Sequence, residues 1–410
     1  MASILKNWRE AATLILVTSS NISRSARIQL TNATLAKEST TGESTTSDVK
    51  ARKQSIIRED DFEVLMLKRS AKSKFMPNVY VFPGGVADSD FSAQWLSVFN
   101  KLGQNVCKRI FENVTVDSSK AAPMFTRERS QAYTAIPSEV AFRICAIRET
   151  FEESGVLLAQ PANQSIASSI YSQNRVLSPA LLHEDVNVIN NWRQRVNKDP
   201  TEFLKMCLEL DLVPEVWSLY EWSNWLTPTL RHEQGRRFDT AFFVCCVDHK
   251  PTAAVDLAET VNALWASPSS LLSAYFKQKG GLAPPQVYEL SRLLNFKSAS
   301  DLHHLVSGPN RSRVERWLPI ALVCKTHTLS LMPGDDLYPE AVDNVDPQIL
   351  NFDEESLEEL NTKYRRHHRV VMGKGQADPG MHILCNTQPS EGHVNPNIDL
   401  FEKIRLKANL

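Results

Sequence analysis

The sequence predicts an α/β protein, and three strand-like segments and one long helix carry this prediction. Residues 8–17, 62–69 and 238–247 are apolar runs of strand length, rich in β-branched and aromatic side chains. Residues 138–154 are expected to be helical, because Glu139 stands in the first turn and Gly155 can end the helix in a left-handed conformation. Strands interspersed with helices are typical of a sheet covered by helical layers.

The first two strands are expected to pair with each other. Residues 8–17 contain the apolar run from Ala11 to Val17, and residues 62–69 largely alternate apolar and polar side chains. The intervening residues 36–60 are rich in Ser, Thr and charged side chains, which cannot bury a core. We therefore expect a disordered loop there.

A glycine turn follows the next short apolar stretch. Pro83-Gly84-Gly85 allows the backbone to approach a ligand closely. Residues 89–137 show only helical fragments, and residues 159–225 are also expected to be helical and irregular. Further elements are expected as helices at 268–276 and 287–296 and as strands at 320–324 and 369–372.

Composition excludes several classes of protein. The 410 residues carry a net charge of −1, which argues against a general nucleic-acid binder. No apolar run approaches the roughly 18 residues of a membrane span. Seven scattered cysteines without C-x-x-C spacing predict buried thiols rather than a zinc site or disulfides.

The helix at 138–154 carries an acidic turn. Glu149, Glu152 and Glu153 stand at i, i+3 and i+4, which places three carboxylates on one face. Such a face is either a solvated surface or a site for a hard divalent cation, which binds carboxylate oxygens and substrate phosphates.

The glycine turn and the acidic turn together resemble the Nudix hydrolase signature, G-x5-E-x7-R-E-U-x-E-E-x-G-U. Arg148-Glu149, Glu152-Glu153 and Gly155-Val156 match its second half, and Gly85 its first. Between the halves stand 49 extra residues, so the middle glutamate is displaced. Counting back from Arg148 places it at Val140, which has no carboxylate, so the candidates for its place are Asp88, Asp90 and Glu139.

The insertion resembles one branch of the superfamily, the peroxisomal acyl-coenzyme A diphosphatases. Five further segments are similar to this branch: 8–12, 82–86, 222–228, 237–243 and 282–286. The resemblance implies an α/β/α sandwich with a mixed sheet. It also implies a Nudix domain at 1–300, with insertions at 89–137 and 159–225, and a C-terminal extension at 301–410 packed on the core.

The resemblance implies hydrolysis of coenzyme A and acyl-coenzyme A to 3′,5′-ADP and (acyl-)4′-phosphopantetheine. Mg²⁺ or Mn²⁺ would be held by Glu149, Glu152, Glu153 and the Gly85 carbonyl. Glu149 would serve as general base, while Arg148 would order the glutamates. The alternatives are another nucleoside diphosphate substrate or a catalytically silent binding module.

Other side chains are weaker candidates. Arg236 and Arg237 either contact a substrate phosphate or form an ordinary basic cluster beside a strand. Trp222 and Trp225 either stack on adenine or pack in the core. Glu259 is a candidate metal or water ligand from a loop.

The last residues suggest a location. Lys407-Ala408-Asn409-Leu410 resembles a variant of the Ser-Lys-Leu peroxisomal address. The sequence therefore predicts a protein of the peroxisomal matrix, bound by an import receptor through Ala408-Asn409-Leu410.

Overall fold

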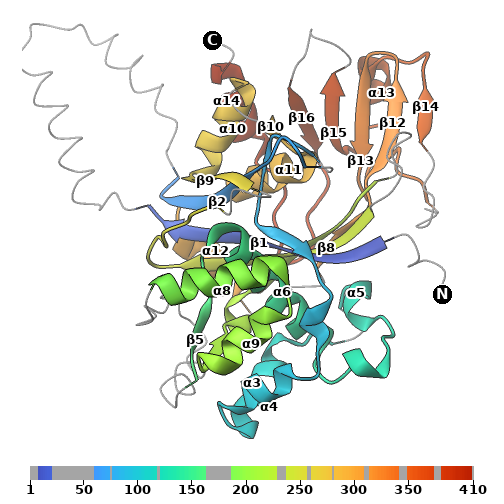
Figure 1. The fold of residues 1–410 in the computed structure, drawn as a ribbon. Helices are drawn as coiled ribbons and strands as arrows, with labels where there is room; N and C mark the ends of the chain where they lie inside the picture. Colours follow the sequence, from blue (N-terminus) through green and yellow to red (C-terminus); the bar gives the residue numbers. More distant parts are fainter. Residues whose placement is uncertain are drawn as a thin grey trace, which may run out of the picture.

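The computed structural model describes the following parts of the chain: residues 8–20, 60–73, 76–117, 121–162, 186–228, 237–255, 260–278, 281–308, 314–340, 349–373 and 380–408. Several predictions fall outside them, namely most of the loop at 36–60 together with Arg236, Glu259 and Asn409-Leu410. The predicted α/β class is confirmed in the described part, where a mixed sheet lies between helical layers (Figure 1).

The central strand of the sheet is β1 (Trp8–Ser19), and it organises the site described below. It pairs in parallel with β8 (Arg237–Val247) along almost its whole length, from Trp8 opposite Arg237 to Thr18 opposite Val247. On its other edge it pairs antiparallel with β2 (Phe62–Arg69) and with β4 (Gly84–Val86). The apolar runs of β1 and β8 are buried because helices cover both faces.

Nine described strands belong to this sheet, in the order β10-β3-β2-β1-β8-β7-β11, with β4 on β1 and β9 on β2. The remaining bounds are β3 (Val79–Val81), β7 (Tyr220–Leu226), β9 (Thr260–Ala266), β10 (Gly281–Leu282) and β11 (Glu315–Trp317). A short separate pair joins β5 (Ala159–Pro161) to β6 (Leu212–Pro214).

Helices on one face of the sheet bury the apolar side of α6 (Ser138–Ser154). This layer contains α3 (Trp95–Asn100), α4 (Gln104–Val114), α5 (Pro123–Thr126), α8 (Val186–Lys198) and α9 (Glu202–Glu209), with the short turns η2 (Ser89–Phe91), η3 (Gln131–Tyr133) and η4 (Val216–Ser218). Because α6 lies between the sheet and these helices, it is buried around nearly its whole circumference (Figure 1).

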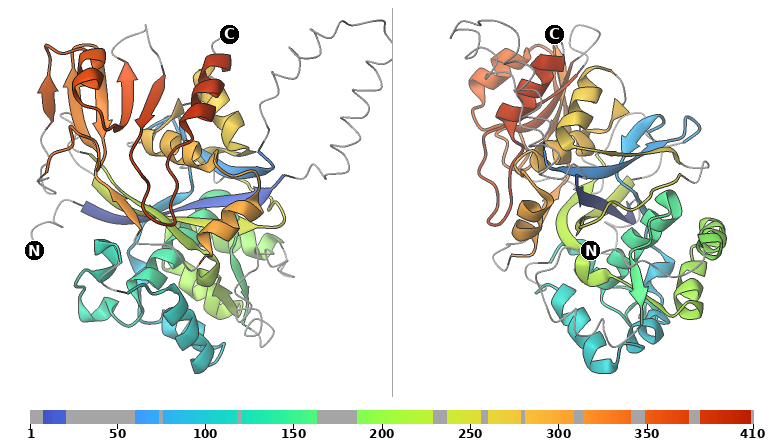
Figure 2. Two further views of the ribbon diagram at one scale, coloured as in Figure 1. Left: turned by 180° about the vertical axis from the view of Figure 1, so that it is seen from behind. Right: turned by 90° about the vertical axis from the view of Figure 1, so that its left-hand side faces the viewer.

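The opposite face is covered by α10 (Pro268–Phe276), α11 (Pro284–Leu293), α12 (Ala299–Val306) and α14 (Ile398–Ala408). Figure 2 shows these helices and the C-terminal strands on the side of the sheet away from α6. The C-terminal strands form a second sheet in the order β14-β12-β13-β15-β16. Its bounds are β12 (Ile320–Cys324), β13 (His327–Leu331), β14 (Leu350–Phe352), β15 (His368–Gly373) and β16 (Met381–Cys385), with α13 (Leu357–Lys363) beside it.

The helical prediction for 159–225 is only partly correct. Helices α8 and α9 lie inside it, but 220–226 is strand β7, which pairs with β8 and β11. The segment carries the polar residues Ser223 and Asn224 in its middle, and both are buried and hydrogen-bonded to carboxylates. These buried polar residues hide the pattern of a central strand.

Two predictions from composition can be compared with the structure. All seven cysteines are free thiols, six of them buried, as their spacing predicted. None of the helices in the described residues combines the length and apolar character that a bilayer crossing requires.

Candidate active site

The acidic turn lies in the last turn and a half of α6, next to the glycine turn. The helix ends where predicted, because Gly155 adopts φ 73° and its N–H bonds to the carbonyl of Phe151. The 49 extra residues therefore do not separate the two halves of the signature in space. Instead β1 supports β4, and α6 packs against both strands.

The two glycines of the turn contact two of the glutamates. The N–H of Gly84 donates to Glu153 Oε2 at 3.0 Å. A Cβ on Gly85 would stand 2.4–2.5 Å from the carboxylate of Glu149, so any side chain at this position would displace that carboxylate. The turn thus lies directly against the acidic side of the helix.

Arg148 connects the remaining carboxylates. Its Nη1 donates to Glu149 Oε1 at 2.9 Å and to Glu152 Oε1 at 2.6 Å. Its Nη2 also donates to the carbonyl of Val86 at 3.0 Å, which ties α6 to the end of β4. The Arg148 side chain is only 2% exposed, whereas those of Glu149 and Glu152 are 15% and 14% exposed. Arg148 therefore fixes the orientation of the two glutamates from the buried side, while part of each glutamate stays exposed.

Asp90 lies on the other side of Arg148. It is buried, and its two oxygens accept from Nε at 2.9 Å and Nη2 at 3.0 Å of Arg148, a bidentate ion pair. Of the three candidates for the displaced glutamate, Asp90 is thus the one that joins the cluster. Glu139 lies in the first turn of α6 and accepts from the N–H of Val116, Val140 is an apolar core residue, and Asp88 is exposed.

The electrostatics of this cluster oppose the ionisation of Glu152. Burial, with a contribution from the negative charges of Glu149 and Asp90, raises the pKa of Glu152 to about 8, although Arg148 acts in the opposite direction. Burial alone would lower the pKa of Arg148, but Asp90 and Glu149 outweigh it and raise that pKa. The single positive charge of Arg148 therefore does not fully compensate the mutual repulsion of these carboxylates.

These residues suit a hard divalent cation. Oxygens of Glu149 and Glu152 converge on one nitrogen of Arg148, and Gly85, whose carbonyl is the further expected ligand, lies against the carboxylate of Glu149. In the described residues no three acidic, His or Cys side chains are arranged around one point. Mg²⁺ does not require such a cage, because it is commonly bound by one or two carboxylates together with substrate phosphates and water.

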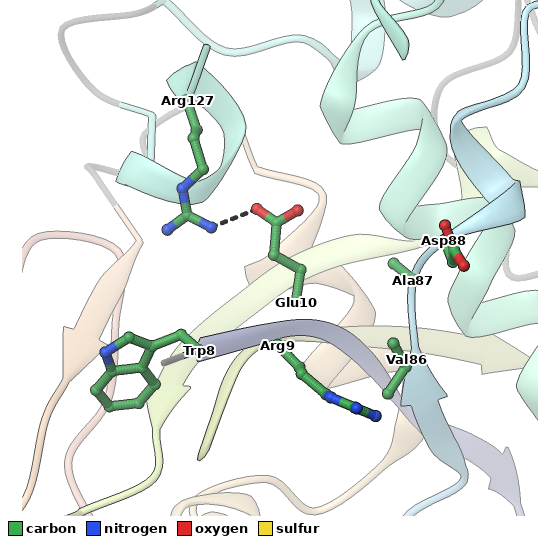
Figure 3. A pocket seen from close by; sticks show the side chains of 7 residues that line it. All are labelled: Trp8, Arg9, Glu10, Val86, Ala87, Asp88 and Arg127. Carbon is green, nitrogen blue, oxygen red and sulfur yellow. Dashed lines mark hydrogen bonds and ion pairs between the residues drawn. The ribbon is translucent and has the colours of Figure 1, made fainter. Parts of the chain in front are cut away.

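A cavity of about 470 Å³ opens beside the glycine turn. It is lined by Trp8, Arg9, Glu10, Val86, Ala87, Asp88 and Arg127. Figure 3 shows Arg127 and Glu10 on one side of β1 and Arg9 on the other, with Val86 to Asp88 along one wall. A second cavity of about 300 Å³ shares Arg127 and is otherwise formed by residues 115–139, which belong mainly to the insertion.

Sequence reasoning missed the charge network that forms the wall between the two cavities. Glu10 accepts from Arg127 at 2.5 Å and from Arg129 at 2.6 Å. Asp239 on β8 accepts from Arg127 at 3.1 Å and from Arg316 at 3.2 Å. These contacts join residues that are far apart in the chain. The only feature of the sequence that pointed to them was the family resemblance of segments 8–12 and 237–243, which contain Glu10 and Asp239.

The other predicted candidates lie at different places. The guanidinium of Arg237 stacks 3.8 Å from the ring centre of Trp8, beside the first cavity. Trp222 and Trp225 are buried, and both indole N–H groups donate to Glu289, so they pack in the core and do not stack on a base.

Comparisons with known proteins agree with this geometry. The family model described as NUDT19 Nudix domain matches residues 8–293, and the NUDT19 C-terminal domain model matches residues 321–377. The chain is 37% identical over 399 residues to the acyl-coenzyme A diphosphatase NUDT19 of Xenopus laevis, covering 97% of each protein.

The corresponding proteins of Gallus gallus and Homo sapiens are also similar. The first is 38% identical over 82% of this chain and 88% of the relative, and the second 37% identical over 85% and 90%. The matches span both halves of the split signature as well as the strands that bring them together. The chain therefore belongs to the Nudix hydrolase superfamily, in the branch of the acyl-coenzyme A diphosphatases.

Proposed function

We propose that the protein hydrolyses the phosphoanhydride of coenzyme A and acyl-coenzyme A to 3′,5′-ADP and (acyl-)4′-phosphopantetheine. The observation that carries the proposal is the intact cluster of Arg148, Glu149, Glu152 and Glu153 beside Gly84-Gly85, in a chain whose relatives are named acyl-coenzyme A diphosphatases. A silent binding module would have no need to keep Glu149 and Glu152 partly exposed above a buried arginine.

Nudix hydrolases generally use divalent metal ions, and we propose Mg²⁺ or Mn²⁺ for this protein. Glu149, Glu152 and the Gly85 carbonyl would hold the ion, with Glu153 as a further ligand. Bound there, the ion neutralises phosphate oxygens and makes water a better nucleophile.

The protein's own groups have distinct tasks in this proposal. Glu149 accepts the proton of the attacking water, since its carboxylate lies against Gly85 and is partly exposed. Arg148 fixes the orientation of Glu149 and Glu152, and Asp90 fixes Arg148. The bond from the Gly84 N–H to Glu153 keeps the turn against the helix.

A substrate screen tests the reaction. Purified protein with Mg²⁺ or Mn²⁺ is incubated separately with acyl-coenzyme A and ADP-ribose, and the products are separated and identified. We expect 3′,5′-ADP and acyl-4′-phosphopantetheine from the former. Cleavage of ADP-ribose with acyl-coenzyme A left intact would overturn the substrate assignment.

We also propose that the protein is a peroxisomal matrix enzyme, imported by a receptor that recognises Ala408-Asn409-Leu410. The support is the terminal sequence itself. Deleting Leu410 should leave a fluorescent fusion in the cytosol, and import of the truncated fusion would refute the address.

A further inference from the structure

We propose that the cavity at the start of β1 binds the 3′-phosphate of coenzyme A, with Arg9 as the contacting residue. The enzyme would then discriminate between coenzyme A and its 3′-dephosphorylated form. The identity of the ligand rests on the proposed function, whereas the anion site itself rests on the observations below.

The cavity is in the right place for a second phosphate group. Val86 lines it and directly follows Gly85, which contacts Glu149. One strand residue advances the chain by about 3.3 Å, so the cavity begins close to the acidic turn. In coenzyme A the 3′-phosphate and the 5′-diphosphate are attached to the same ribose. A 3′-phosphate site must therefore lie close to the carboxylates, as this cavity does.

The charge network in the cavity wall has more arginines than carboxylates. Three arginines, Arg127, Arg129 and Arg316, share the two carboxylates of Glu10 and Asp239. Both oxygens of Glu10 accept from arginine, so its charge is neutralised in place. Guanidinium groups with too few carboxylates in a half-buried site favour an anionic ligand. Arg127, which lines the cavity, is part of this network and donates to both carboxylates.

Arg9 adds a second cation on the other side of β1. Its side chain is exposed, and within the described residues no ion pair or hydrogen bond involves its guanidinium. In Figure 3 it extends along the cavity toward Val86. A planar guanidinium with unused N–H groups binds phosphate oxygens in a bidentate manner. The carboxylate of Asp88 also lines the cavity and is exposed, as Arg9 is, so it offsets part of the positive charge there.

Kinetics with paired substrates test the assignment. We expect the wild-type enzyme to have a lower KM for coenzyme A than for 3′-dephospho-coenzyme A, by about tenfold, the worth of a charge-assisted hydrogen bond. Arg9→Gln should raise the KM for coenzyme A by about that factor and leave both kcat and the KM for the dephospho form unchanged. Arg365→Gln is the matched control, because Arg365 is also exposed but lies beside the second sheet. Loss of activity on both substrates in equal measure would overturn the proposal.

Binding separates this proposal from the proposed function. Calorimetry on the full chain without added metal compares 3′,5′-ADP with 5′-AMP, which differ only in the 3′-phosphate. We expect tighter binding of 3′,5′-ADP to the wild type and equal binding of the two to Arg9→Gln. If the protein hydrolyses neither coenzyme A nor its esters but shows this pattern, the anion site stands and the reaction does not. Equal binding of both nucleotides to the wild type would overturn the anion site.

Discussion

Two buried arginines in this protein face glutamates on their own helices, yet the two clusters are built differently. On α11, the carboxylate of Glu289 accepts from the indole N–H groups of Trp222 and Trp225, from the hydroxyl of Ser223 and from Arg292. Both side chains of the Glu289–Arg292 pair are 0% exposed. On α6, by contrast, Glu149 and Glu152 share one nitrogen of Arg148 and keep part of their surface exposed.

The difference shows how a buried arginine paired with a glutamate of its own helix can belong to a structural or to a functional site. In the α11 cluster, β7 supplies neutral donors that satisfy both oxygens of Glu289, so no ligand is needed. In the α6 cluster, the neighbouring segment is the glycine turn. Its backbone lies close to the glutamates, but its glycines have no side chains that could donate to them. A charge left partly uncompensated at a reachable surface is typical of a ligand site, whereas a saturated one stabilises the fold.

The largest expected effect is on catalysis. Glu152→Gln should reduce turnover of acyl-coenzyme A by about a thousandfold, because a neutral amide cannot replace a carboxylate that holds a cation. The thermal midpoint should not fall, since burial and the charges of Glu149 and Asp90 already oppose the ionised Glu152. Steady-state kinetics and calorimetry measure the two quantities. Unchanged turnover would mean that the α6 cluster is structural like that of α11.

The second largest effect is on stability. Glu289→Ala should lower the free energy of unfolding by about 3–5 kcal/mol, because it leaves Arg292 buried and removes the acceptor of two indoles. Urea unfolding followed by tryptophan fluorescence measures this loss. Glu354→Ala, on an exposed turn, is the control and should change stability by less than about 0.5 kcal/mol. A loss no larger than the control's would contradict the structural role of Glu289.

An intermediate effect is expected at Asp90, a fully buried carboxylate that belongs to the α6 cluster. Asp90→Asn weakens its bidentate pair with Arg148, so Arg148 should hold Glu149 and Glu152 less firmly. We expect kcat to fall by about tenfold with little change in KM, the mark of a positioning residue. Asp90→Glu should recover part of the activity, and a change in KM alone would argue against this role.

The smallest effect concerns a third buried carboxyl group, Glu215. It is 0% exposed, and burial raises its pKa well above the usual value. It accepts from Gln160, while its second oxygen has no partner among the described residues, and the buried thiol of Cys245 is also near it. Its stabilising contribution is therefore complete below the unfolded-state pKa, about 4.3, and declines as pH rises toward the folded-state pKa.

Glu215→Gln removes this titration and keeps the shape of the side chain. The thermal midpoint of the wild type should therefore fall more between pH 5 and pH 8 than that of the variant. Parallel curves for the two proteins would show that Glu215 is ionised in the fold.

Local signals predicted much of the site, and long-range contacts account for what they missed. The helix of the acidic turn, its end at Gly155 and the strands β1, β2 and β8 follow from periodicity and glycine placement over short windows. The partner of Arg148 could not be predicted from the sequence, because the insertion changes the spacing that identifies the middle glutamate. Asp90 was one of three candidates, and only the fold shows that its carboxylate reaches Arg148.

The sequence did not predict strand β7 or the charge network around Glu10, and the reason is related. Ser223 and Asn224 look incompatible with a central strand until Glu289 and Asp239 are brought beside them by other elements. Likewise Arg127, in the insertion, meets Glu10 and Asp239 only in the folded protein. Buried polar contacts between distant segments leave no periodic trace in the sequence.

The pairing of β1 with β8 has a consequence for how the enzyme is made. Trp8 pairs with Arg237, so the strand that supports the glycine turn finds its main partner only after more than half of the chain has left the ribosome. Contacts of such long sequence separation slow folding, because the entropy of closing the loop must be overcome before the strands gain their hydrogen bonds. A nascent or truncated chain that stops before β8 should therefore lack hydrolase activity, even though both halves of its signature have already been synthesised.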